Sequence, residues 1–195
     1  MAPIAAELIY LTMGVMADYL FGADDGDRAR AVIGGMFPLR HNLFSFEFAD
    51  VVMLAGKPAG LVVTFPVKTM QSLELQTAYQ LARTSGLATL LRMVVRARPL
   101  AGVQEAENDE YFVPHLAVLP GFQGRGLGKI LLAHAESKAK QAGLATIALT
   151  VEVENKRAIS LYARQGFQIV ETCTFPSLKK RIGYNGFHRM AKNLA

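Results

Sequence analysis

Apolar residues follow a helical period at the start of the chain and a strand-like pattern soon after it. They recur every three to four positions at Ile4, Leu8, Leu11, Val15 and Tyr19. This spacing predicts a helix over residues 3–21. The run GADDGD at 22–27 is typical of a turn, and a second helix is predicted over 28–36. Residues 44–67 predict two strands joined around 56–58, because apolar residues flank a Gly-Lys-Pro turn.

The middle of the chain predicts two helices and then a buried strand. Residues 69–97 are rich in helix-forming residues and are interrupted at Ser85 and Gly86. Their apolar positions suit core packing, a wall of a ligand pocket or a dimer face. These positions are Met70, Leu73, Leu90, Leu91 and Met93. Residues 110–119 predict the buried strand, and Pro114 within it predicts a bulge.

The last third of the chain alternates between helices and strands. One apolar stripe predicts a helix over 126–142, and Gly143 is suited to end it. The stripe consists of Leu127, Ile130, Leu131, Ala135 and Ala139. A strand is predicted over 144–153, and Asn155 is suited to cap a helix that ends near Gly166.

Two further strands, at 167–175 and 186–194, complete the predicted order. A hairpin followed by mixed helices and strands is typical of an α/β (α+β) architecture with helices covering a mixed sheet. A chain of 195 residues is long enough for one sizeable core. We therefore expect a single three-layer domain over residues 1–195.

Composition and charge narrow the class of protein. Hydrophobic residues make up 51% and charged residues 19% of the chain, which indicates a globular rather than a disordered protein. The formal net charge of +5 and a pI of about 9.4 suit an anionic partner. A nucleic acid, a membrane surface and a phosphorylated cofactor all meet this description.

The absence of certain sequence features bears on the cellular location of the protein and on metal binding. Cys173 is the only cysteine, which excludes an intrachain disulfide and favours a reducing compartment. The N-terminal segment has no basic n-region, and Glu7 and Asp18 flank its apolar core, so a signal peptide is not predicted. No uncharged apolar run approaches the roughly 18 residues of a membrane span. We expect a cytoplasmic protein without membrane partners, and no Cys/His spacing predicts a metal site.

The stretch LAVLPGFQGRGLGKILL at 116–132 places a glycine-rich turn between a predicted strand and a predicted helix. Such a turn suits an anion, because glycines let the backbone approach a ligand and the first helical turn has unpaired N–H groups. A dinucleotide fingerprint would need glycine at the position of Lys129. A P-loop would need glycine at Gln123 and a hydroxyl residue at Ile130. A tight glycine turn without a ligand is the remaining alternative.

A third motif fits. The residues from Gln123 to Gly128 have the form Q/R-x-x-G-x-G/A, which resembles motif A of the GNAT superfamily of acetyl-CoA-dependent N-acetyltransferases. About 30 residues further along, VEVENKRAISLYARQGF resembles motif B of that family. The matching positions of motif B are Asn155, Ala158, Leu161, Tyr162, Gly166 and Phe167. The similarity covers roughly residues 110–170, and residues 40–70 match the family's central hairpin by pattern. The chain departs from the family in starting directly with a helix, without the usual first strand.

The resemblance implies a mostly antiparallel mixed sheet whose central strands splay apart, and acetyl-CoA as co-substrate. It implies direct transfer of an acetyl group, in a ternary complex, to a primary amine of a small molecule or peptide. The loop would wrap the pyrophosphate of coenzyme A, and strand residues would offer backbone groups to the pantetheine arm. The implied cofactor-binding residues are Leu116, Val118, Gln123, Gly124, Arg125, Gly126, Leu127, Gly128, Lys129, Asn155 and Tyr162.

Catalytic roles are also implied by the resemblance. The backbone N–H of Val118 would polarise the thioester carbonyl, and Tyr162 would give a proton to the leaving thiolate. Tyr162 also suits plain packing on a helix face. Asn155 suits a helix cap, a contact to the cofactor arm, or both.

The general base is not identified by any motif. Glu110 and Tyr111 lie at the start of the strand near which the family often places one, and His115 is a candidate because its pKa is near neutral. No supporting pattern surrounds the other three histidines, and His134 is expected to be partly buried beside a helix stripe. Those histidines are His41, His134 and His188. Cys173 is expected to be a small core residue rather than a nucleophile.

The acceptor is the part that the sequence specifies least. A cationic amine would be attracted by one acidic cluster, Asp24, Asp25 and Asp27. An acidic acceptor or a cofactor phosphate would instead be attracted by one basic cluster, Lys179, Lys180 and Arg181. Both clusters also suit solvated loops. A domain that binds acetyl-CoA without catalysis is the alternative function. Nucleic-acid binding is disfavoured because the basic residues are scattered without a stacking motif. The chain is compatible with a homodimer.

Overall fold

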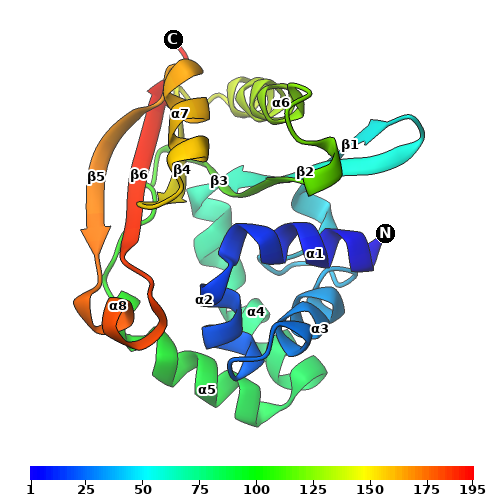
Figure 1. Cartoon of the computed structure of the whole chain (residues 1–195), viewed down its shortest axis with the longest axis vertical. Helices are drawn as coiled ribbons and strands as arrows, with labels where there is room; N and C mark the ends of the chain where they lie inside the picture. The colour runs from blue at the N-terminus through cyan, green and yellow to red at the C-terminus, as the bar shows by residue number, and fades with distance from the viewer.

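The computed structural model describes residues 1–195, and its centre is one open, six-stranded mixed sheet (Figure 1). The strand order is β1-β2-β3-β4-β6-β5, and only β3 and β4 run parallel. The strands are β1 (Ala49–Leu54), β2 (Lys57–Pro66), β3 (Glu110–Val118), β4 (Thr146–Glu152), β5 (Gln168–Thr174) and β6 (Gly186–Asn193). The predicted α/β class and the mixed, mostly antiparallel sheet are confirmed.

Helices cover both faces of this sheet. The helices are α1 (Ala2–Met13), α2 (Val15–Ala17), α3 (Gly26–Met36), α4 (Val67–Ser85), α5 (Leu87–Ala97), α6 (Leu127–Gln141), α7 (Lys156–Arg164) and α8 (Pro176–Ile182). In Figure 1, α6 and α7 lie on one side of the sheet, and α1 and α3 lie on the other. The predicted break between two helices near residue 86 is confirmed, because Gly86 at φ 84° separates α4 from α5.

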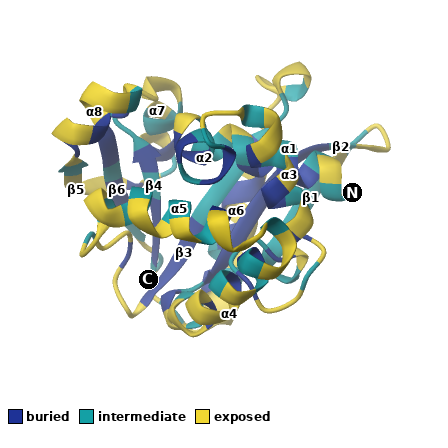
Figure 2. Cartoon of the chain, turned by 90° about the horizontal axis from the view of Figure 1, so that it is seen from below, coloured by how far each residue is buried: buried dark blue, intermediate teal, exposed yellow.

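Alternation along the strands divides the buried side chains between two layers of core. Leu61, Val63 and Phe65 of β2 pack toward α1 and α3, whereas Val62 packs toward α6. Buried residues line the strands and the inner helix faces, and exposed residues lie on the outer helix faces (Figure 2). The central strands are therefore buried on both faces, which explains why their sequences are continuously apolar.

A β-bulge interrupts β3 at the predicted proline. Val63 is paired with His115 and Phe65 with Phe112, so β3 carries one residue more than β2 between these pairs. Pro114 lies in this extra stretch, where its missing N–H costs no ladder hydrogen bond.

The parallel pairing of β3 with β4 stops at the same point. It runs from Glu110 opposite Thr146 to Val113 opposite Leu149 and goes no further. Beyond it, β3 keeps its pairing with β2 but has no strand on its other side. The splayed central strands expected from the family resemblance are present.

The prediction of a continuous helix over 3–21 is wrong. The chain bends by 100° after α1, because Gly14 adopts φ 51° and ψ −131°. Residues 15–22 then form α2 and one π-helical turn. The apolar period passes through the bend because both segments pack against buried core. No helix is by itself long and apolar enough to cross a membrane; the segments before and after Gly14 pass that test together only as this bent pair.

The prediction and the structure differ at two further points. The helix expected from residue 28 begins at Gly26, because the Asp25 carboxylate accepts hydrogen bonds from the N–H groups of Asp27 and Arg28. The helix α8 was not predicted; it begins at Pro176, and the segment was expected to be a loop. No strand precedes α1, and β1 forms the sheet edge.

Candidate functional site

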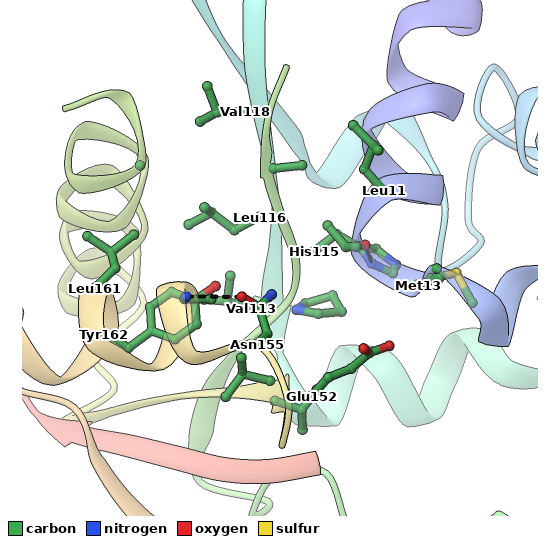
Figure 3. Close-up of a pocket in the computed structure, with 18 of the residues that line it drawn as sticks. Leu11, Met13, Val113, His115, Leu116, Val118, Glu152, Asn155, Leu161 and Tyr162 are labelled. Carbon is green, nitrogen blue, oxygen red and sulfur yellow. Dashed lines mark hydrogen bonds between the residues drawn. The ribbon is translucent and has the colours of Figure 1, made fainter. Parts of the chain in front are cut away.

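The unpaired edge of β3 borders a cavity of about 740 Å³. Helix α1 lies on one side of this strand, and α6 and α7 lie on the other (Figure 3). Leu116 and Val118 point toward α6 and α7, whereas His115 points toward α1 (Figure 3). The splay of β3 from β4 thus creates the space in which a ligand can lie against a strand edge.

Backbone groups of β3 face this space. The Leu119 N–H donates to the Ala59 carbonyl at 2.9 Å, so it points toward β2. Because alternate residues of a strand present their N–H groups to opposite sides, those of Leu116 and Val118 face away from β2 and toward the cavity. The Val118 carbonyl accepts a hydrogen bond from Gln123 Nε2 at 3.0 Å, and its N–H has no partner.

The glycine-rich loop presents further backbone donors. Gly124 and Gly126 adopt φ of 77° and 76°, in the left-handed region that favours glycine. The N–H groups of residues 124–128 have no partner within the protein, and α6 begins at Leu127. Unpaired N–H groups at a helix N-terminus make a site for an anion. Gly128 serves packing, because a Cβ there would lie 3.0 Å from the Leu161 side chain.

Positively charged side chains lie beside these backbone N–H groups. Lys129, Arg157 and Arg164 line the cavity, and Arg157 Nη1 lies 2.7 Å from Gln123 Oε1. The sequence analysis did not identify the two arginines as site residues. They are seven residues apart, which is two helical turns, so they lie on the same face of α7. This spacing could have indicated them. Arg125 does not line the cavity, and its guanidinium lies 5.9 Å from the Phe122 ring.

The structure brings the other predicted cofactor-loop residues into this one cavity. They are Gln123, Gly124, Gly126, Leu127, Gly128 and Lys129. Leu116, Val118, Asn155 and Tyr162 also line it.

Tyr162 serves packing and faces the cavity at once. Its side chain is buried, and its ring centre lies 6.1 Å from that of Phe167. Burial raises the pKa of Tyr162 to about 12, so the hydroxyl keeps its proton at neutral pH. That hydroxyl has no hydrogen-bond partner within the protein and is available to a ligand.

Asn155 likewise combines both expected roles. Its Oδ1 accepts a hydrogen bond from the Ala158 N–H at 3.1 Å, which caps α7 (Figure 3, dashed line). The residue also lines the cavity, and its Nδ2 remains unpartnered.

His115 is hydrogen-bonded to Thr12. The Thr12 hydroxyl lies 2.7 Å from His115 Nδ1 and 2.7 Å from the Ile9 carbonyl. When the hydroxyl donates to the carbonyl it accepts from Nδ1–H, and Nε2 is then unprotonated. Burial lowers the pKa of His115 to about 4, and its ring stacks on Phe44 with centres 6.0 Å apart. A neutral imidazole with an available lone pair thus lies in the cavity wall.

Carboxyl groups gather in another part of the lining. Glu105 comes from the loop between α5 and β3, and Glu152 ends β4. Glu105 is exposed and Glu152 is half-buried. Burial raises the pKa of the Glu152 carboxyl group, and Glu154 raises it further. Tyr184, just before β6, lines the same region, and its pKa is raised by burial and then by Glu152 and Glu105. No motif marked these residues in the sequence.

The charged clusters considered for the acceptor lie elsewhere. Asp24 pairs with Arg96 at 3.2 Å, Asp25 caps α3, and Asp27 lies 3.6 Å from Arg30. None of the three aspartates lines the cavity. The basic residues Lys179, Lys180 and Arg181 lie exposed on α8, and they do not line it either.

The remaining histidines are also outside the cavity. His134 was expected to be partly buried but is exposed, and its Nε2 lies 3.3 Å from Asp50. His41 lies 3.7 Å from Glu47, and His188 Nδ1 lies 2.8 Å from the Thr172 hydroxyl.

Comparison with known proteins places this geometry in a family. The family model described as "Acetyltransferase (GNAT) family" matches residues 51–167. The [ribosomal protein bS18]-alanine N-acetyltransferase of Salmonella typhimurium is 42% identical over 59 residues, which are 30% of this chain and 40% of that protein. The mycothiol acetyltransferase of Streptomyces avermitilis is 46% identical over 57 residues, 29% of this chain and 18% of that protein. The chain thus matches less than half the length of these relatives.

Solved structures agree with the fold over nearly the whole chain. An N-acetyltransferase from Staphylococcus aureus has a TM-score of 0.73 at 17% identity, covering 97% of this chain and 94% of that one. A crystal structure described as an acetyltransferase has a TM-score of 0.71 at 20% identity, covering 100% and 95%. At these identities the likeness concerns the fold alone. Taken with the family match over residues 51–167, it means that the chain belongs to the GNAT family of acetyltransferases.

Proposed function

We propose that this protein transfers an acetyl group from acetyl-CoA to a primary amine of a small molecule or peptide. One observation carries the proposal: unpartnered backbone N–H groups of a strand edge and of a glycine loop border the same cavity as Tyr162. The names of the two relatives, a ribosomal-protein-alanine N-acetyltransferase and a mycothiol acetyltransferase, support a reaction of this kind.

The lining residues fit coenzyme A. Unpartnered N–H groups at two left-handed glycines, together with Lys129, Arg157 and Arg164, are suited to a pyrophosphate. The open edge of β3 is suited to the amide groups of a pantetheine arm, in the manner of an added strand. When bound, acetyl-CoA supplies an acetyl group activated as a thioester.

Three groups of the protein then have separate roles in the reaction. The Val118 N–H is a fixed donor for a carbonyl oxygen. The Tyr162 hydroxyl holds a proton for a departing thiolate, and its high pKa keeps that proton in place until it is needed. His115 Nε2 accepts a proton from the attacking nitrogen in the tautomer whose Nδ1–H donates to the Thr12 hydroxyl.

Release of free coenzyme A thiol from acetyl-CoA tests the proposal directly. The purified chain is mixed with acetyl-CoA and with separate groups of primary amines: polyamines, aminoglycosides, amino acids and peptides. Amine-dependent release is expected with at least one group, with the acetylated amine detected by mass spectrometry. Tight binding of acetyl-CoA without release for any amine would contradict catalysis and favour a sensor of acetyl-CoA.

A further inference from the structure

Two carboxyl groups in the cavity lack a protein partner. Neither Glu105 nor Glu152 forms an ion pair or a side-chain hydrogen bond within the protein. Glu152 Oε1 lies 3.8 Å from the position that a Cβ on Gly14 would occupy, so its carboxyl reaches the end of α1. Figure 3 shows this side chain extended away from Tyr162. Glu152 is half-buried, whereas Glu105 is exposed. An uncompensated carboxylate is costly where water is limited, as at Glu152, and a bound cation would offset that cost.

Tyr184 gives an independent indication of a ligand in this region. The residue is only 9% exposed, and its hydroxyl has no hydrogen-bond partner. Its ring stacks on Phe175 with centres 6.1 Å apart, which fixes its orientation. A buried tyrosine hydroxyl ordinarily has a partner, so one that lines a cavity without one is suited to bind a ligand group.

The charges of the lining are separated. Its lysine and arginine side chains come from α6 and α7, beside the glycine loop: Lys129, Arg157 and Arg164. None of them pairs with Glu105 or Glu152. A negatively charged acceptor is therefore disfavoured near these carboxylates, and a positively charged one is favoured.

The part of the lining that packs around Tyr184 is apolar. Met16 and Phe187 belong to a buried cluster that includes Tyr184, and Leu20 and Leu100 pack against it. These four residues line the cavity. Such a wall suits methylene groups, which gain by leaving water.

From this arrangement we propose that the acceptor is an aliphatic diamine or polyamine. One nitrogen is acetylated, and a second, protonated nitrogen is bound by Glu105, Glu152 and the Tyr184 hydroxyl. A monoamine brings no second cation to the two carboxylates, whereas the protonated nitrogen of a diamine compensates one of the two negative charges. This inference rests on the proposed acetyl transfer and names its substrate class.

Three acceptors of matched length test the substrate class. They are 1,5-diaminopentane, pentylamine and 5-aminopentanoate, compared by kcat/KM for thiol release. The diamine is expected to exceed pentylamine by at least about tenfold, which corresponds to about 1.4 kcal/mol, and the aminopentanoate is expected to be poorest. Equal rates for the diamine and pentylamine, or a preference for the aminopentanoate, would overturn the proposal.

Variants and a binding measurement separate this proposal from the proposed function. Glu105→Gln and Tyr184→Phe are expected to lower kcat/KM for the diamine about tenfold or more and that for pentylamine by less than about threefold. Calorimetry of 1,5-diaminopentane binding to the protein with coenzyme A requires no acetyl transfer. Binding that is weakened by Glu105→Gln would support the diamine site even if no thiol were released, whereas no binding would overturn it. If acetyl transfer occurs but only peptides are acetylated, the proposed function stands and the diamine proposal fails.

Discussion

The two ends of the cavity are built in different ways. The end assigned to coenzyme A comes from one continuous stretch, residues 110–167, and most of its donors are backbone N–H groups. The end assigned to the acceptor comes from α1, the loop between α5 and β3, His115 of β3, the end of β4 and the residues before β6. Its polar groups are side chains: His115, Glu105, Glu152 and Tyr184.

This difference separates the binding of a common cofactor from the selection of a particular acceptor. Backbone donors at glycines can bind the same phosphate whatever the surrounding side chains, so the same loop serves acetyl-CoA for many acceptors. Side chains from distant segments can change one at a time and thereby change the acceptor. Substitutions at one end should therefore affect acetyl-CoA binding, and those at the other end should affect acceptor selection.

The largest expected effect lies where the two ends meet. Tyr162→Phe removes the proposed proton donor but keeps the ring that packs near Phe167. We expect kcat to fall by about 10²-fold or more, as for loss of a general acid. The Kd for acetyl-CoA should change by less than about twofold, because the contacts assigned to the cofactor remain. Steady-state kinetics and calorimetry measure the two quantities. Unchanged turnover would show that Tyr162 is not the proton donor, and it would contradict the proposed division between the two ends of the cavity.

The next effect concerns the backbone of the glycine loop. Gly126→Ala places a side chain at φ 76°, which costs about 1–2 kcal/mol in the left-handed region. The substituted loop is expected to leave this conformation, and the Kd for coenzyme A should rise about tenfold. Gly121→Ala is the matched control, because Gly121 has no positive φ and a Cβ there meets open space. Equal Kd values for the two variants, measured by calorimetry, would show that loop conformation does not govern binding.

A smaller effect is expected from a single charge beside the loop. Lys129→Ala should raise the Kd for coenzyme A by several-fold, with a weaker dependence on salt, because one cation near the phosphates is lost. Lys140→Ala is the control, since it removes the same charge from an exposed position at the other end of α6. Titrations at two salt concentrations measure both. A response to Lys140→Ala as large as that to Lys129→Ala would indicate a general charge effect instead of a local one.

The remaining effect concerns stability instead of turnover or binding, and it is a pH dependence at the acceptor end. Burial lowers the pKa of His115 from 6.5 to about 4. Between these pH values the unfolded state binds the proton more readily, so stability is lost as pH falls from about 6.5 toward 4. His115→Gln removes this dependence, and its melting temperature should fall less steeply between pH 7 and pH 5 than that of the native protein. Parallel melting profiles in scanning calorimetry would mean that the histidine is not held neutral in the fold.

Local sequence signals determined the parts of the site that depend on local backbone geometry. The glycines at 124 and 126 predicted the left-handed turn, and Asn155 predicted the start of α7. Pro114 predicted the bulge in β3. In each case the residue type restricts the conformation of its own backbone or of the next few residues, so the sequence contains the necessary information.

Features that depend on contacts between distant segments were decided only by the tertiary structure. The bend at Gly14 was hidden because both adjoining segments keep an apolar face toward buried core. Glu105, Glu152 and Tyr184 lie far apart in the sequence and meet only because β4, β6 and the loop before β3 converge. The sequence by itself therefore determined the family and the end of the cavity assigned to acetyl-CoA. The acceptor end required the fold, because side chains from separate segments have no fixed spacing along the chain.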